Sequence, residues 1–211
     1  MLREIFPVIV YENYIEDSSY SMIREKIYDY IDNNRQSFYK IDSWLGDTLT
    51  DFPKTNFYNE YLEREIYKHS YSYLESINPD IFELTISHLW INMNKNKTFQ
   101  EDHDHAGPGV QISGTLYIEP CEYGGYFEIP NPNNAEQFFG SNNLNIERSK
   151  IRIKPERKKI VLFPSYLKHR VTPNEGNTER VSISFNLSVV DFEYHKLYRK
   201  GNPSYFGYKE K

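Results

Sequence analysis

A change in hydrophobic periodicity near residue 83 constrains the fold of this 211-residue chain more than any other feature. Before it, apolar residues recur three to four positions apart; after it, they alternate with polar residues, which is the period of a β-strand. Strands are predicted at about 83–94, 110–119, 125–129, 151–154, 159–163 and 180–190, between clusters of Gly, Pro and Asn. Many short strands after helices predict one mainly β, α+β unit, a β-sandwich with N-terminal helices packed on one face.

Two amphipathic helices are expected before the strands. The first has its apolar face at Met22, Ile23, Ile27 and Ile31, and the polar residues 17–19 before it are typical of a capped helix N-terminus. The second follows Pro53 with Tyr58, Leu62, Ile66, Tyr73 and Ile77 on one face, Asn56 as its N-cap and Pro79 at its end. We therefore expect a single domain over 1–211, with a helical support at about 1–80, a strand-rich core at about 82–192 and a C-terminal tail at 193–211.

The composition excludes several classes of protein. No apolar stretch approaches the ~20 residues that cross a membrane, so no membrane partner is expected. The net charge of −5 argues against a protein that binds nucleic acid by neutralising phosphates. Cys121 is the single cysteine and cannot form an internal disulfide, and the first residues do not look like a secretory signal. These features predict a cytoplasmic location, the host cytoplasm if a phage encodes the chain.

The densest group of chemically active residues is the run Glu101-Asp102-His103-Asp104-His105. In an extended backbone, residues two apart face the same way, so His103 and His105 can direct two imidazoles to one point while Asp104 faces away. A third imidazole, His169, follows the apolar strand 160–163 and a Pro turn. The spacing is that of metal ligands.

A later strand adds a polar wall. Along 180–190, Val181, Ile183, Phe185, Leu187 and Val189 form one face and Arg180, Ser182, Ser184 and Asn186 the other. Three side-chain ligands on iron(II) leave positions open for a bidentate 2-oxo acid and for dioxygen. The guanidinium of Arg180 offers a fork for the distal carboxylate of 2-oxoglutarate, with the Ser182 hydroxyl beside it.

These pieces also resemble a known family. The ordered set is Trp90-x-Asn92, His103-x-His105, 113–118 (SGTLYI), Gly124-Gly125, 163–169 (FPSYLKH) and 180–186 (RVSISFN), after an opening Ile5-Phe6-Pro7. It is similar to the 2-oxoglutarate/Fe(II) oxygenases of bacteria and phages, of the prolyl-hydroxylase-like type. The resemblance implies a double-stranded β-helix, or jelly roll, with the first histidine and His169 on iron, and Arg180 and Tyr117 on the co-substrate. It also implies that the protein is a hydroxylase that uses Fe(II) as its metal and 2-oxoglutarate and O2 as co-substrates.

The chain departs from that family at the third ligand. Relatives usually carry His-x-Asp or His-x-Glu where this chain has His103-Asp104-His105. Three alternatives follow: His105 is the third ligand, Asp104 takes that place, or water completes the site. The substrate is also open, since a peptide side chain, a small metabolite and a nucleobase all fit the chemistry.

Two other functions are compatible with a jelly roll. A cupin, as a metal-dependent isomerase or a binding module, typically has Glu three or four residues after His-x-His, where this chain has Pro108 and Gly109. A structural or carbohydrate-binding jelly roll gives no reason for Arg180, Ser182 and Tyr117 to share a cavity. Both are weaker than the oxygenase hypothesis.

The remaining features have simpler interpretations. His69, His88 and His195 are expected to be packed or surface residues, and Cys121 to be structural. The basic run 148–159 is expected to form a solvated hairpin face. The Asn-rich segment 131–145 is either a surface loop or a flap over a site, and 194–211 is either a tail or an arm on a neighbouring subunit of a homodimer.

Overall fold

The computed structural model describes residues 8–52, 55–77, 82–131 and 150–191. Its helices are α1 (Asp17–Asn34), α2 (Glu60–Ile77) and the short 3-10 helix η1 (Arg35–Ser37). The strands are β1 (Tyr11–Tyr14), β2 (Tyr39–Lys40), β3 (Leu49–Thr50), β4 (Phe82–Asn94), β5 (Gln100–His103), β6 (Ile112–Glu119), β7 (Phe127–Pro130), β8 (Lys150–Ile153), β9 (Lys159–Pro164), β10 (His169–Val171) and β11 (Arg180–Asp191).

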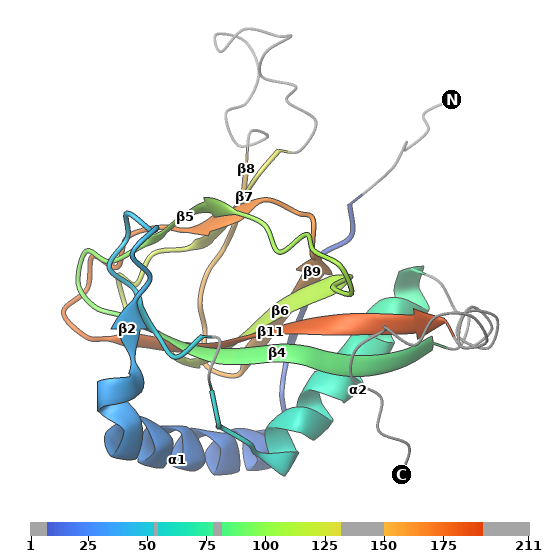
Figure 1. Ribbon diagram of the computed structural model, residues 1–211, viewed down its shortest axis with the longest axis horizontal. Coiled ribbons are helices and arrows are strands. Elements are labelled where there is room, and N and C mark those ends of the chain that lie inside the picture. The colour runs from blue at the N-terminus through green and yellow to red at the C-terminus, as the bar shows by residue number, and fades with distance from the viewer. Residues whose placement is uncertain (1–7, 53–54, 78–81, 132–149, 192–211) are drawn as a thin grey trace, which may run out of the picture.

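The strands form two antiparallel sheets. The large sheet has the order β1-β9-β6-β11-β4-β3-β2 and the small sheet the order β5-β10-β7-β8. The small sheet lies over the large one, while α1 and α2 run beneath the other face of the large sheet (Figure 1). This arrangement confirms the mainly β fold predicted from the periodicity.

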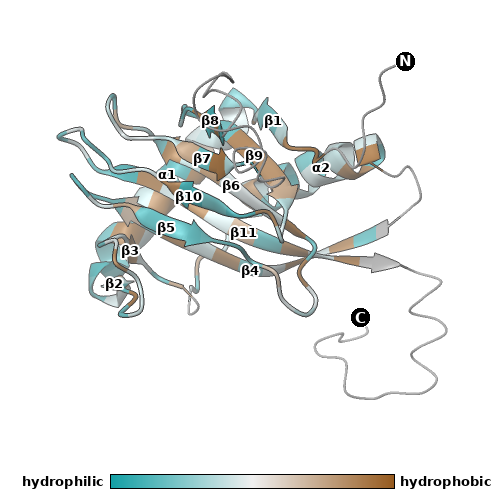
Figure 2. Cartoon of the chain, turned by 90° about the horizontal axis from the view of Figure 1, so that it is seen from above, coloured by the Kyte–Doolittle hydropathy of each residue, from teal (hydrophilic) through white to brown (hydrophobic). Residues whose placement is uncertain are grey.

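Two apolar clusters hold the layers together. The larger one lies between the helices and the large sheet. It joins residues of α1 (Ile23, Ile27 and Ile31) and of α2 (Leu62 and Ile66) to the helix-facing side of β4, β6, β9 and β11. The smaller cluster lies between the sheets and includes Phe127, Ile153 and Phe163. Hydrophobic residues accordingly appear as brown segments on β6 and β9, whereas β5 is largely hydrophilic (Figure 2).

The alternation along β11 is observed as predicted. Val181, Ile183, Phe185 and Leu187 are buried in the larger cluster. Arg180, Ser182, Ser184 and Asn186 point the other way and line a cavity. One strand thus serves both the core and the site.

The helices differ from the sequence prediction at their ends. Asn56 does not cap α2; Asn59 does, because the helix begins at Glu60 and the Oδ1 atom of Asn59 accepts the N–H of Leu62 at 2.9 Å. Tyr58 lies before the helix and is exposed, and Met22 and Ile77 are also exposed. Pro79 and the segments 132–149 and 192–211 lie outside the described residues, so the expectations about the Asn-rich loop, His195 and the tail stay predictions. Neither α1 nor α2 is both long and apolar enough to cross a membrane.

Candidate active site

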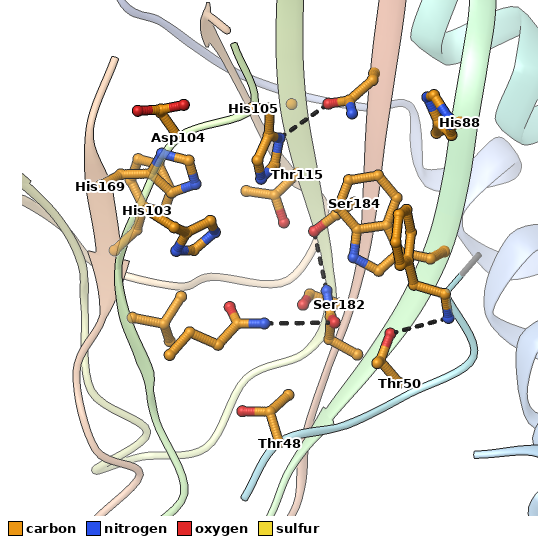
Figure 3. Close-up of a pocket in the computed structure, with 18 of the residues that line it drawn as sticks. Thr48, Thr50, His88, His103, Asp104, His105, Thr115, His169, Ser182 and Ser184 are labelled. Atoms are coloured by element: carbon orange, nitrogen blue, oxygen red, sulfur yellow. Dashed lines mark hydrogen bonds between the residues drawn. The ribbon is translucent and has the colours of Figure 1, made fainter. Parts of the chain in front are cut away.

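Three histidines on or directly after two strands of the small sheet converge. His103 ends β5, His169 begins β10, and the two residues are paired across the strands. His105 follows β5, where its backbone N–H donates to the carbonyl of Ser165 at 2.8 Å. One ring nitrogen from each histidine lies within 4.8 Å of the others, and the imidazoles gather on one side of the cavity (Figure 3). The predicted ligand spacing is therefore realised.

Asp104 does not take part in this cluster. Its side chain is exposed, and its Oδ1 atom accepts the backbone N–H of Ala106 at 3.1 Å. Figure 3 shows its carboxylate set apart from the three rings. Asp104 faces away from the rings because neighbouring residues of an extended chain point to opposite sides.

Each of the three imidazoles uses Nδ1 for a hydrogen bond within the protein. The Nδ1 of His103 is 2.7 Å from the carbonyl of Glu101, and that of His169 is 2.9 Å from the carbonyl of Leu167. A carbonyl can only accept, so Nδ1 carries the proton in both rings and Nε2 keeps a lone pair. In His105, Nδ1 lies 2.9 Å from Oδ1 of Asn186, again an acceptor. Three Nε2 atoms are thus available to a metal ion.

Burial keeps these imidazoles neutral. Desolvation lowers the pKa of His103, and it lowers the pKa of His105 to about 4 with help from the neighbouring His103. The pKa of His169 falls well below its usual value for the same two reasons. Neutral imidazole is the form that binds a metal. The donor set fits an iron(II) ion, for which imidazole nitrogen is a suitable ligand.

Arg180 lies in the wall of the same cavity and is 1% exposed. Its Nη1 donates to the carbonyl of Gly124, but its Nη2 is buried without a hydrogen-bond partner among the described residues. A buried unpaired guanidinium is costly, and burial lowers its pKa. The free Nη2 is therefore a fit for one carboxylate of a ligand.

Ser182 and Tyr117 accompany Arg180. They are cross-strand partners on β11 and β6, and both line the cavity. Burial raises the pKa of Tyr117, so its phenol stays protonated and can donate a hydrogen bond. The three residues proposed from the sequence to meet a co-substrate thus share one chamber with the three imidazoles.

The cavity has a volume of about 610 Å³, which exceeds the space that a small dicarboxylate fills. Trp44, Phe52 and Trp90 are among its lining residues. The rings form a series, with Phe52 and Trp90 5.1 Å apart between centroids, and Trp90 and His105 5.5 Å apart. The remaining volume can hold a second molecule next to the metal position.

Sequence reasoning missed the segment between β2 and β3. Trp44 on this segment packs on His103 with a centroid distance of 5.0 Å. The side chain of Glu101 holds the segment by accepting the N–H groups of Leu45 at 3.0 Å and Gly46 at 3.3 Å. The strands β2 and β3 have two residues each, too few for a periodic signal, so no pattern in 39–50 could have placed Trp44 here.

The other residues singled out from the sequence lie elsewhere. His88 is exposed at the cavity edge and outside the metal-ligand cluster, and His69 is buried in α2. Cys121 is buried with a free thiol. In the basic run, Arg152 and Arg157 are more than half exposed, whereas Lys159 is buried against Glu156.

A jelly roll whose cavity holds three convergent neutral imidazoles and an unpaired buried arginine has the donor groups that a non-haem metal ion and an anionic co-substrate require. Residues 88–186 match the family model described as "Putative 2OG-Fe(II) oxygenase". The match contains all three histidines and Arg180, and it confirms the resemblance of the chain to the 2OG-Fe(II) oxygenases. Fe(II), 2-oxoglutarate and O2 are the reactants that this family implies.

Solved structures support the same fold. A prolyl-4-hydroxylase from Pseudomonas putida superposes with a TM-score of 0.58 at 10% identity, over 85% of this chain and 91% of the other. A viral collagen prolyl hydroxylase from Paramecium bursaria Chlorella virus-1, in its 2OG complex, gives 0.54 at 14% identity, over 86% and 96%. The carbocyclase SnoK from nogalamycin biosynthesis gives 0.59 at 7% identity, over 85% and 79%. No curated protein matches the chain.

Proposed function

We propose that the protein is a hydroxylase in which His103, His105 and His169 hold Fe(II) and Arg180, with Ser182 and Tyr117, holds 2-oxoglutarate. One observation carries the proposal: Arg180, whose Nη2 is buried and has no hydrogen-bond partner among the described residues, lines the same cavity as three imidazoles with free Nε2 atoms. In this family, iron and 2-oxoglutarate supply the oxidant from O2, and the co-substrate leaves as succinate and carbon dioxide.

The chain's own residues do three things in this scheme. The imidazoles, fixed through Nδ1, keep the coordination geometry. Arg180 fixes the far end of the co-substrate by a charge-assisted hydrogen bond, which orients its 2-oxo acid end toward the metal. Trp44, Trp90 and Phe52 give the cavity an aromatic lining that would contact the substrate and exclude water.

The substrate that this chamber favours is uncharged or cationic. Apart from the histidines, Arg180 and Asp104 are the charged residues among the described lining residues. With Arg180 engaged by the co-substrate, no cation of the described lining is left to hold a phosphate. We infer a small molecule or a peptide side chain with an apolar or ring-shaped part as the substrate, acted on in the cytoplasm.

Anaerobic calorimetry tests the metal site. His103→Ala and His169→Ala are each expected to abolish Fe(II) binding, because losing a ligand costs orders of magnitude in affinity. His88→Ala is the matched control for iron affinity, since His88 lies at the cavity edge outside the cluster. Unchanged iron affinity in both ligand variants would refute the metal site.

Succinate release then tests the reaction. The iron-loaded protein, supplied with 2-oxoglutarate and O2, is expected to form succinate slowly alone and faster with a true substrate. A panel of peptides and small molecules sorted by charge identifies the substrate class. Faster succinate release only with phosphorylated compounds would contradict the inferred chamber chemistry.

A further inference from the structure

His105 is held by a small network that the metal chemistry does not by itself explain. Oδ1 of Asn186 lies 2.9 Å from Nδ1 of His105 and accepts the Ser113 hydroxyl at 2.8 Å. The Ser113 oxygen is in turn 3.0 Å from the same Nδ1. Ser113 and Asn186 are direct cross-strand partners on β6 and β11, and both side chains are buried. The three side chains thus form a closed triangle behind the metal position.

The sheet has a local irregularity next to Asn186. Along β4 and β11 the pairing shifts between Asn186, opposite His88, and Leu187, opposite Ile86. Ser87 is therefore the extra residue of a β-bulge, and its hydroxyl donates to the backbone carbonyl of Asn186 at 3.2 Å. The bulge thus gives the backbone of Asn186 a side-chain contact from the neighbouring strand, whereas the regular alternation along β11 directs its side chain to the cavity.

His105 differs from the other two histidines in the kind of acceptor it uses. The Nδ1 atoms of His103 and His169 bond to backbone carbonyls, which any residue at those positions would supply. The acceptor of His105 is a side chain and therefore depends on one amino-acid choice. An amide oxygen can only accept, so it fixes Nδ1–H and leaves Nε2 for the metal.

We infer that Asn186, supported by Ser113, is the positioning residue that makes His105 a metal ligand at the place where the family pattern has a carboxylate. This inference rests on the proposed function. Without the amide, the imidazole can rotate or protonate Nε2 in place of Nδ1, and the third donor is lost. Ser113 contributes less, because Asn186 can still accept from His105 when the hydroxyl is absent.

The test compares variants by anaerobic titration with Fe(II), and with Co(II), whose absorption spectrum reports the ligand set directly. Asn186→Leu keeps the size but removes the acceptor, and it is expected to weaken metal binding about 10- to 100-fold and alter the Co(II) spectrum. Asn186→Asp restores an acceptor and is expected to keep both. Ser113→Ala should cause a smaller loss than Asn186→Leu. Asn92→Leu is the matched control, because this buried asparagine also faces the cavity but donates to Ser184 at 3.0 Å instead of a histidine.

A double-mutant cycle shows whether Asn186 acts through His105. In a His105→Ala background, Asn186→Leu is expected to cause no further loss of metal affinity. Wild-type metal affinity in Asn186→Leu, or a loss that persists undiminished in the His105→Ala background, would overturn the inference. If the wild type itself bound no metal through His103 and His169, the proposed function would fail instead, so the two failures are distinguishable.

Discussion

Replacing Arg180 with lysine separates charge from geometry in the co-substrate site. The guanidinium has two tasks: Nη1 donates to the carbonyl of Gly124, and Nη2 is free for a carboxylate. A lysine ammonium keeps the charge, but its single nitrogen cannot reproduce the planar fork. The variant therefore loses one hydrogen bond between charged groups, or leaves the Gly124 carbonyl unpaired.

The loss can be estimated from those contacts. A hydrogen bond to a charged group contributes about 1.5–3 kcal/mol, which corresponds to a roughly 10- to 100-fold higher Kd for 2-oxoglutarate. Calorimetry on the iron-loaded, oxygen-free protein measures this value, and iron affinity should not change because Arg180 touches none of the three imidazoles' ring nitrogens. Arg157→Lys is a suitable control, since that arginine is exposed and pairs with Glu119. Wild-type affinity for 2-oxoglutarate in Arg180→Lys would show that the assignment of Arg180 is wrong.

Three further predictions address the ligand set, the helices and the sheet. His105→Asp is expected to retain measurable iron binding, and His105→Ala is expected to lose most of it. Asp104→Ala should bind iron as the wild type does. If calorimetry gave the opposite results for the two alanine variants, Asp104 would be the ligand. Burial lowers the pKa of His69 below its usual 6.5, so its contribution to stability is present above pH 6.5 and is lost as the pH falls. His69→Gln should reduce the pH dependence of unfolding free energy by up to ~1.4 kcal/mol per pH unit, measured by urea titration, and an unchanged slope would contradict this assignment. Gly114→Ala would place a Cβ atom 2.4 Å from Cζ of Phe185, which should destabilise the fold by roughly 1–3 kcal/mol in thermal unfolding; an unchanged Tm would show that the core yields freely.

The sequence predicted the parts of the fold that have a strong period. Alternation along β11 placed Arg180 and Asn186 on the cavity side, and the i, i+2 rule brought His103 and His105 together. The short strands β5 and β10 were not predicted, because four residues of composition QEDH and three of HRV carry no hydrophobic alternation. Their pairing depends on long-range contacts that a local pattern does not contain.

The supporting contacts of the site were also beyond local patterns. The side chain of Asn186 contacts His105, 81 positions earlier in the chain, and Ser113, 73 positions earlier. The packing of Trp44 on His103 depends on the carboxylate of Glu101. In each case the partners are distant in sequence and close only after the sheets have formed.

Glu101 supports His103 and the segment that carries Trp44 through separate atoms. Its backbone carbonyl holds the Nδ1–H of His103, while its carboxylate separately holds the N–H groups of Leu45 and Gly46 on the segment that carries Trp44. Because these are different atoms of one residue, losing the carboxylate contacts would leave the acceptor of His103 in place. The position of Trp44 and the tautomer of His103 therefore have separate supports within a single amino acid.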